Sequence, residues 1–135
     1  LFRSDQFIKP MILVVEDDIL NQKLITFYLR EKYDMCYGAS VIESKKCLEA
    51  NNPDLVLLDL SLLGGENGLE LCYYIKNSDK WNHIPVIAVT AHAFSETRQA
   101  CEDAGSDAYM TKPVKKNELI NMIEKYLPST KKQTT

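Results

Sequence analysis

Several features that would assign a protein class directly are missing from this sequence of 135 residues. No apolar run approaches the roughly 20 residues that cross a bilayer, and no basic segment followed by an apolar one suggests a signal peptide. The chain has only two histidines, and its four cysteines lack Cys-x-x-Cys spacing, so a zinc site is not indicated. The net charge of −3 argues against nucleic-acid binding, which usually needs a basic face.

The four cysteines, Cys36, Cys47, Cys72 and Cys101, each fall in an apolar or helical context, where a free thiol behaves as a small hydrophobe. Free thiols are typical of a reducing compartment, so we expect a cytoplasmic protein with no direct contact to membrane or nucleic acid. The chain begins with Leu1 rather than Met, and we expect it to be a piece or a processed product of something longer.

Hydrophobic residues make up 45% of the chain and charged residues 26%, which is ordinary for a globular fold. The length suits one domain with a real core. We expect a linker at residues 1–10, a domain at 11–127 and a disordered polar tail at 128–135. The sequence contains no internal repeat.

Short apolar runs predict five strands. The run at residues 55–58 is apolar on both faces, as expected of a central parallel strand covered by helices on each side. Further strands are expected at 11–15, 33–39, 86–90 and 108–110.

Helical spacing between and after the strands predicts five helices. The first carries Leu20, Leu24, Phe27 and Tyr28. The second is capped by Ser40 with Glu43 as its capping-box partner, and carries Val41, Ser44, Cys47 and Leu48 on one side. The remaining three are expected at 69–77 (Leu69, Cys72 and Ile75 or Tyr73 inward), 95–104 (closed by Gly105) and 116–126 (Leu119, Met122, Ile123 and Tyr126 inward). This alternation predicts an α/β fold with a doubly wound parallel sheet and helices on both faces.

Polar residues follow four of the five strands. Because parallel strands end at one edge of the sheet, these residues should meet there: Glu16, Asp17, Asp18, Asp59, Thr90 and Lys112. Carboxylates so gathered repel one another unless a cation is present, and hard oxygen ligands without a histidine cluster suit Mg²⁺ rather than zinc. Asp59 could then act as a nucleophile, with Lys112 and Thr90 suited to phosphoryl oxygens.

A simpler interpretation treats these residues as structural. Asp59 could be a turn residue, and acids near a helix start interact favourably with the helix dipole. That interpretation accounts for Asp18, but it does not explain why Asp59 and Lys112 should converge on one edge.

Four segments, residues 12–18, 54–59, 87–91 and 107–113, in this order and spacing resemble the receiver domain of two-component response regulators over about residues 11 to 127. The resemblance implies a five-stranded sheet of flavodoxin-like order 2-1-3-4-5. Asn21-Gln22-Lys23 and Lys112-Pro113-Val114 are similar to receivers attached to hybrid sensor histidine kinases, so the parent chain could be such a kinase.

The resemblance also implies roles in a phosphorelay. Asp59 would accept a phosphoryl group from a phosphohistidine on a kinase or phosphotransfer domain. Mg²⁺ would be bound by Asp17 and Asp59, by Glu16 through water and by the Ser61 carbonyl. Thr90 and Lys112 would contact phosphoryl oxygens, Thr90 and Tyr109 would form the switch, and the Lys112–Pro113 peptide would be cis. The isolated domain would be a phosphoacceptor rather than a turnover enzyme, and a monomer or weak dimer.

The chain departs from the family pattern after Asp59. Leu63 replaces the usual proline, and Gly64-Gly65 lie in a loop one residue longer than usual. Ser61 and His92 occupy positions that tune the phosphoryl lifetime in the family.

Other functions on the same topology are less well supported. A flavin carrier needs a Ser/Thr- and Gly-rich phosphate loop after the first strand, and an aspartate-nucleophile phosphatase of the haloacid dehalogenase type needs Asp-x-Asp there. Both motifs are absent. A receiver-like interaction module that is never phosphorylated remains an alternative.

Overall fold

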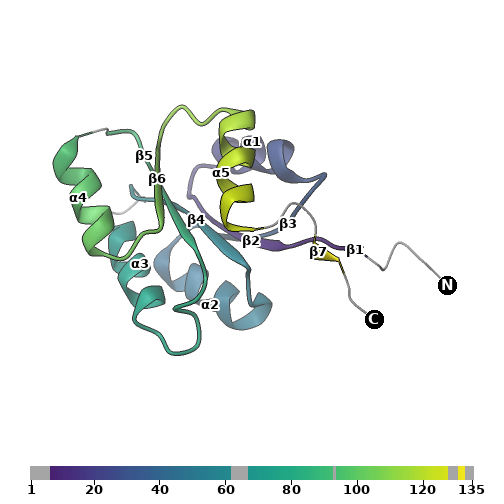
Figure 1. The fold of residues 1–135 in the computed structure, drawn as a ribbon, viewed down its shortest axis with the longest axis horizontal. Coiled ribbons are helices and arrows are strands. Elements are labelled where there is room, and N and C mark those ends of the chain that lie inside the picture. The colour runs from purple at the N-terminus through teal and green to yellow at the C-terminus, as the bar shows by residue number, and fades with distance from the viewer. Residues whose placement is uncertain (1–6, 62–66, 93, 128–130, 133–135) are drawn as a thin grey trace.

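The computed structural model describes residues 7–61, 67–92, 94–127 and 131–132. Within these ranges five parallel strands alternate with five helices, in the doubly wound order β3-β2-β4-β5-β6 (Figure 1). This is the predicted α/β fold, in which the central strands run in the order 2-1-3-4-5. The strands are β2 (Met11–Val15), β3 (Asp34–Gly38), β4 (Leu55–Asp59), β5 (Val86–Thr90) and β6 (Ala108–Thr111), and the helices are α1 (Ile19–Leu29), α2 (Val41–Asn51), α3 (Gly68–Lys76), α4 (Ser95–Asp103) and α5 (Lys116–Tyr126).

Alternate side chains of the strands enter two separate cores. Leu13 and Val15 of β2 pack in the cluster that contains residues of α2, α3 and α4. Ile12 and Val14 pack in the cluster that contains residues of α1 and α5. All five residues of β4 are buried, because helices cover both faces of this central strand. The helices cover the faces of the sheet and leave the ends of its strands as two edges, and the C-terminal ends of the strands form one of them.

The predicted starts of α2, α4 and α5 are confirmed, whereas α3 begins at Gly68, one residue before the predicted start. The Ser40 hydroxyl accepts the Glu43 N–H at 3.1 Å, as a capping box requires. The Glu43 carboxylate, however, accepts the N–H of Ala39 at 2.9 Å rather than that of Ser40. Gly105, with φ of +95°, follows the end of α4, in the left-handed conformation that glycine adopts without strain.

The face that α1 buries differs from the predicted one. Leu20 and Phe27 are 75% and 59% exposed, whereas Ile25 and Leu29 are buried. Leu24 is also exposed, and Tyr28 is half-buried. Because α1 carries apolar residues on most of its surface, three- and four-residue spacing fits more than one stripe. Packing on the sheet selects the stripe that faces it.

The buried faces of α3 and α5 differ from the predicted ones at single residues. In α3, Leu71 is buried together with the predicted Cys72 and Ile75, while Tyr73 is exposed. In α5, Leu119 and Ile123 are buried as predicted, whereas Tyr126 is exposed and its hydroxyl donates to the Asp107 carbonyl at 2.8 Å. The polar tip of a tyrosine at the end of a helix can reach such a partner while its ring lies at the boundary of the core.

The described parts of the two terminal segments form a small ladder that the sequence did not predict. Phe7–Ile8 (β1) pairs antiparallel with Lys131–Lys132 (β7). Strand β2 begins and helix α5 ends at the same edge of the sheet, so the two segments leave the domain side by side (Figure 1). This proximity explains the pairing of residues that were expected to be a linker and a disordered tail.

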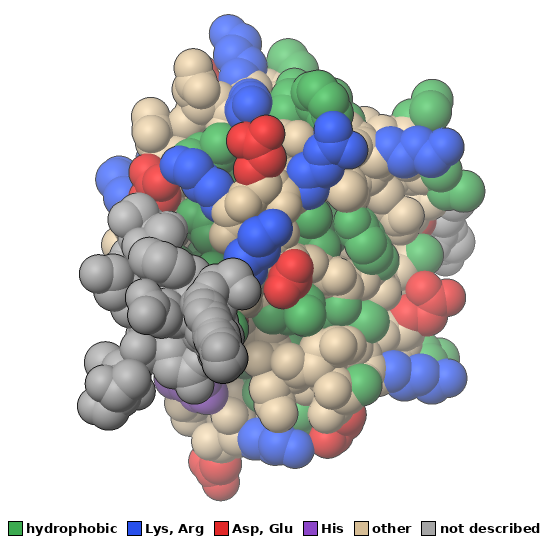
Figure 2. Space-filling view, turned by 90° about the vertical axis from the view of Figure 1, so that its right-hand side faces the viewer, with side chains coloured by type: hydrophobic (Ala, Val, Ile, Leu, Met, Phe, Trp, Pro, Cys, Tyr) green, Lys and Arg blue, Asp and Glu red, His purple; other side chains and the backbone are tan. Residues whose placement is uncertain are grey.

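The surface drawn in Figure 2 carries Lys and Arg side chains scattered among acidic, polar and apolar ones. No continuous basic patch is visible among the described residues of that face. None of the described helices combines the length and the apolar character that crossing a membrane requires.

Candidate functional site

The strand register brings the predicted site residues to one edge. Val15 of β2 is paired with Leu58 of β4. The residues that follow them, Glu16 and Asp59, therefore lie side by side at the C-terminal ends of these strands. Asp59 is paired with Val89 of β5, and the following residue of that strand is Thr90. Thr90 is in turn paired with Thr111 of β6, which places Lys112 immediately beyond that strand.

Three carboxylates form a compact cluster at this edge. One oxygen from each of Glu16, Asp17 and Asp59 lies within 4.8 Å of the others. Glu16 is only 6% exposed and Asp59 only 5% exposed. Two nearly buried carboxylates this close repel each other, and each loses much of its hydration. The cluster therefore has a strong electrostatic requirement for positive charge.

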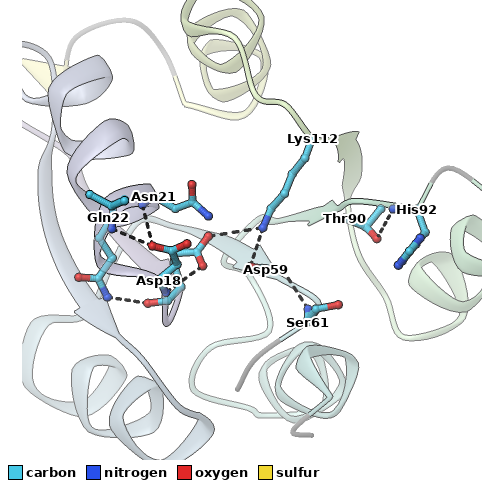
Figure 3. Close-up of polar contacts among 10 residues, drawn as sticks. Asp18, Asn21, Gln22, Asp59, Ser61, Thr90, His92 and Lys112 are labelled. Carbon is cyan, nitrogen blue, oxygen red and sulfur yellow. Dashed lines mark hydrogen bonds and ion pairs between the residues drawn. The ribbon is translucent and has the colours of Figure 1, made fainter. Parts of the chain in front are cut away.

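Lys112 supplies part of that charge. Its ammonium donates to Asp59 Oδ2 at 2.9 Å and lies 3.7 Å from Glu16 Oε1 (Figure 3). The other oxygen of Asp59, Oδ1, accepts the Ser61 N–H at 3.0 Å. The Lys112 N–H donates to the Thr90 carbonyl at 2.8 Å, and the Lys112–Pro113 peptide is cis, as the family resemblance implies. Both oxygens of Asp59 are thus oriented by donors from neighbouring segments.

The ionisation of the cluster reflects this crowding. Burial, followed by the charge of Asp59, raises the pKa of Glu16 to about 7. Burial alone would lower the pKa of Lys112, but the hydrogen bond and charge of Asp59, with the charge of Glu16, outweigh it and raise the pKa. One ammonium is therefore shared by more than one carboxylate.

The donor set fits a magnesium ion. Glu16, Asp17 and Asp59 offer only hard carboxylate oxygens, which Mg²⁺ prefers over the nitrogen and sulfur ligands of zinc. A divalent cation here would also offset the repulsion that Lys112 leaves uncompensated. The acidic pocket of this domain is thus of the type that binds Mg²⁺.

Thr90 and Tyr109 lie on adjacent strands and contact the same residue, His92. The Thr90 hydroxyl accepts the His92 N–H at 3.1 Å (Figure 3). The Tyr109 hydroxyl donates to the His92 carbonyl at 2.8 Å, and the Arg98 guanidinium lies 5.7 Å from the centre of the Tyr109 ring. The segment after β5 is therefore bonded to both predicted switch residues.

The segment after Asp59 is described only in part. Ser61 is exposed and forms an isolated antiparallel bridge with Asn67. Leu63 and Gly64-Gly65, where the sequence departs from the family pattern, lie outside the described residues. Gly68 begins α3 so close to β4 that an added Cβ would lie 2.6 Å from the Asp59 carbonyl oxygen.

A cavity of about 650 Å³ opens beside Asp59 and Lys112. It lies between α1 and the segment that joins β6 to α5, and most of its lining is apolar. The lining residues include Leu24, Ile25, Tyr28, Pro113 and Val114. The carboxylate cluster is therefore reached from a concave and largely apolar surface.

Gln22 lies beside the carboxylate cluster and had no predicted role in it. Its side-chain amide donates to the carbonyl of Glu16 (Figure 3). Two features of the sequence pointed to it: its place in the first turn of the helix after the acidic residues, and its position in the Asn21-Gln22-Lys23 motif.

Comparison with known proteins agrees with the resemblance to receiver domains. Residues 12–124 match the family described as the response regulator receiver domain. The chain belongs to this family. A relative, the polar-differentiation response regulator DivK of Brucella ovis, is 33% identical over 117 residues, covering 86% of this chain and 94% of the relative.

Solved receiver structures agree with the fold. The receiver domain of a sensor histidine kinase from Pseudomonas aeruginosa has 30% identity and a TM-score of 0.79, covering 88% of this chain and 98% of that one. That structure has a magnesium ion coordinated in the active site cleft. The receiver domain of a signal transduction histidine kinase from Syntrophus aciditrophicus has 25% identity and a TM-score of 0.80, covering 93% and 98%.

The chain is thus a receiver domain of two-component signalling whose acidic pocket contains Glu16, Asp17 and Asp59. Receiver domains act with histidine kinases and are phosphoacceptor switches as a family.

Proposed function

We propose that this receiver domain is a signalling switch in which Asp59 accepts a phosphoryl group from a phosphohistidine. The observation that carries the proposal is the position of the Asp59 carboxylate. It is nearly buried, bonded to Lys112, and clustered with Glu16 and Asp17. A carboxylate kept only as a turn residue would not need this set of partners.

In the proposed reaction a carboxylate oxygen of Asp59 forms the new P–O bond while the P–N bond of the phosphohistidine breaks. The imidazole keeps the electron pair of that bond and takes a proton. Lys112 remains beside the carboxylate and neutralises charge on the phosphoryl oxygens, as fixed cations do in phosphoryl transfer. The Ser61 N–H, bonded to Asp59 Oδ1, orients the carboxylate. Thr90 would contact a phosphoryl oxygen through its hydroxyl.

Mg²⁺ would be held by Asp17 and Asp59, by Glu16 through water, and by the Ser61 carbonyl. Its chemistry is the neutralisation of charge on the carboxylates and the phosphoryl oxygens. Support for the ion comes from the oxygen-only donor set of three clustered carboxylates, two of which are nearly buried.

The donor would be a histidine kinase or a histidine phosphotransfer domain. The apolar cavity beside Asp59, which is lined in part by the exposed Leu24 of α1, supports a protein donor, since an exposed apolar patch at a reactive group is typical of a docking surface. The similarity to receivers of sensor histidine kinases supports a hybrid kinase as the parent chain.

Phosphorylation would then change the segment after β5. A phosphoryl group near Thr90 competes for the hydroxyl that now accepts the His92 N–H. Because His92 also bonds Tyr109, a move of Thr90 would alter the position of Tyr109 and of the surface around it. Added phosphate charge is a common cause of such two-state changes.

The proposal is tested by incubating the protein with Mg²⁺ and a phosphohistidine donor, followed by intact mass measurement. Wild type and an Asp103→Asn control, altered at an exposed aspartate of α4, should each gain one phosphoryl group, and Asp59→Asn should gain none. Beryllofluoride with Mg²⁺ should shift the amide NMR signals of Thr90 and Tyr109 in wild type and in Asp103→Asn, but not in Asp59→Asn. A folded wild type that gains no phosphoryl group under any donor would leave the unphosphorylated interaction module as the better account.

A further inference from the structure

The carbonyl of Glu16 belongs to the peptide that joins two of the three clustered carboxylates, Glu16 and Asp17. This carbonyl lies outside the hydrogen-bond ladder of α1, because the first bond of that ladder joins the Gln22 N–H to the Asp18 carbonyl. It accepts instead from the side-chain amide of Gln22, which turns back over the first turn of the helix. Gln22 therefore restrains the peptide group that links Glu16 to Asp17.

Gln22 is itself restrained from the next turn of the helix. Its carbonyl accepts the Thr26 hydroxyl at 2.8 Å, and that hydroxyl also contacts the Tyr37 hydroxyl of β3. The following residue of β3, Gly38, accepts the Glu16 N–H through its carbonyl at 3.0 Å. Bonds from β3 thus reach Glu16 both directly and through α1, which limits the positions that the acidic segment can adopt.

Two further hydrogen bonds restrain carboxylates of the segment Glu16–Asp18. The Glu16 carboxylate accepts the Asp18 N–H at 3.2 Å, and the Asp18 carboxylate accepts the Leu20 N–H at 2.8 Å. These bonds orient side chains, whereas the Gln22 bond acts on the peptide plane between Glu16 and Asp17. A group that is oriented before its ligand arrives binds more tightly, since less conformational freedom is lost on binding.

We propose that Gln22 is a positioning residue of the metal-binding segment, acting through the Glu16 carbonyl to preorganise Glu16 and Asp17 for a divalent cation. The inference rests on the proposed function, because it takes Mg²⁺ as the ligand of this cluster. Among the described residues, the hydrogen bond of the Gln22 side chain is made to the backbone of Glu16 and not to a carboxylate of the cluster.

The test compares Gln22→Leu, which keeps the size and the helix-forming tendency of the side chain but removes the donor, with wild type. Gln99→Leu is the matched control, since Gln99 is a helical glutamine that bonds only within α4 in the described contacts, to Asp103 at 2.9 Å. MgCl₂ is titrated into each ¹⁵N-labelled protein and followed by amide NMR. One lost hydrogen bond predicts a Kd for Mg²⁺ that is about three- to tenfold higher in Gln22→Leu and unchanged in Gln99→Leu.

Two further readouts separate positioning from a general loss of stability. The half-saturating Mg²⁺ concentration for phosphorylation of Asp59 should rise in Gln22→Leu, while the rate at saturating Mg²⁺ stays within about twofold of wild type. The Asp17 amide signal should shift in the metal-free variant, because the Glu16–Asp17 peptide has lost its hydrogen bond. A variant with wild-type Mg²⁺ affinity would overturn the inference.

The outcome for wild type keeps the two proposals distinct. If wild type fails to bind Mg²⁺, the proposed function fails, and an unshifted Asp17 amide in metal-free Gln22→Leu would then reject the restraint by Gln22 as well. If wild type binds Mg²⁺ and is phosphorylated while Gln22→Leu matches it, the role of Gln22 alone is rejected.

Discussion

The ammonium of Lys76 lies 2.7 Å from the Asp107 carboxylate at the edge of the sheet opposite the candidate site. The same ammonium donates to the Ile84 carbonyl at 2.7 Å, and Asp107 accepts the N–H of Val86 at 2.8 Å. These contacts join α3 to the start of β5 and to the segment before β6. They give the N-terminal ends of the strands an ionic group of their own, separate from the acidic pocket.

Asp107→Ala should destabilise the domain by about 1–2 kcal/mol, because it leaves the buried Val86 N–H without its partner; the Lys76–Asp107 ion pair adds less, since the Asp107 side chain is 33% exposed and solvent screens it. Urea unfolding measures the change. Asp103→Ala, at an exposed aspartate, should change stability by less than about 0.5 kcal/mol. Mg²⁺ affinity should be the same in both variants, and a large loss of affinity in Asp107→Ala would contradict the separation of the two edges.

Lys112→Met should lower the stability of the metal-free protein by about 1–3 kcal/mol. It removes the cation from two nearly buried carboxylates, although the Lys112 side chain is 30% exposed and solvent screens part of the effect. The measurement is urea unfolding in EDTA. The control is Lys80→Met, whose ion pair with Glu49 is exposed on both sides and should contribute less than about 0.5 kcal/mol. Equal losses in the two variants would show that burial of the acidic pocket has no energetic consequence.

Added Mg²⁺ should reduce the stability difference between Lys112→Met and wild type. A divalent cation can replace the missing ammonium as a counter-charge, and any ligand that binds only the folded state stabilises it. The difference in unfolding free energy is therefore compared in EDTA and in excess MgCl₂. NaCl of equal ionic strength, without a divalent cation, serves as the control for screening. If NaCl and MgCl₂ reduced the stability difference equally, the result would argue against a specific Mg²⁺ site.

Gly68→Ala should destabilise the domain by about 1–3 kcal/mol, because the new Cβ would overlap the Asp59 carbonyl oxygen and push α3 away from β4. Amide NMR should show shifts at Asp59 and Leu60, since the Gly68 N–H donates to the Leu60 carbonyl at 3.1 Å. Glu70→Ala in the same helix is the control and should leave those signals in place. An unshifted Leu60 amide in Gly68→Ala would mean that the strand and helix can separate freely.

The thiols should differ in reactivity in the native protein. Burial raises the pKa of Cys36 to about 12 and that of Cys72 to about 11, and Cys101 is also buried. The nucleophilic thiolate of these residues is therefore scarce near neutral pH. With a thiol reagent at pH 8, only the half-buried Cys47 should react quickly, and Cys47→Ser should remove that phase.

The pH dependence of this reaction gives a second check. Between pH 7 and 9 an ordinary thiol with a pKa near 8.5 reacts faster as pH rises, because its thiolate fraction increases. Cys36 and Cys72 should lack this increase, because their raised pKa values keep them protonated throughout the window. All four thiols should react at similar rates in denaturant, and fast labelling of Cys36 without unfolding would contradict its burial.

Much of the site could be predicted from single stretches of sequence. Buried runs with no polar face identify central parallel strands, and such strands all end at one edge. Asp59 and Lys112 were therefore expected to meet although 53 positions separate them. The Asp18 cap of α1 follows from its place before the helix, and the side chain does accept the Leu20 N–H.

Other features could not be predicted because more than one arrangement satisfies the local pattern. The apolar residues of α1 offer several stripes, and only contact with the sheet selects Ile25 and Leu29. The role of Gln22 depends on its side chain turning back to the Glu16 carbonyl. The sequence does not indicate this contact, because a polar residue in the first turn of a helix is usually solvated. The Lys76–Asp107 pair joins residues 31 positions apart that carry no shared motif.

The order of strands and helices, the fold class and the edge at which the acidic residues collect were determined by the sequence itself, since each depends on local periodicity and on the geometry of parallel strands. The tertiary structure alone decided which helical faces are buried, which donors orient Asp59 and Glu16, and how the terminal segments pair. These features depend on distances between residues remote in the chain, and such distances exist only after the helices pack on the sheet.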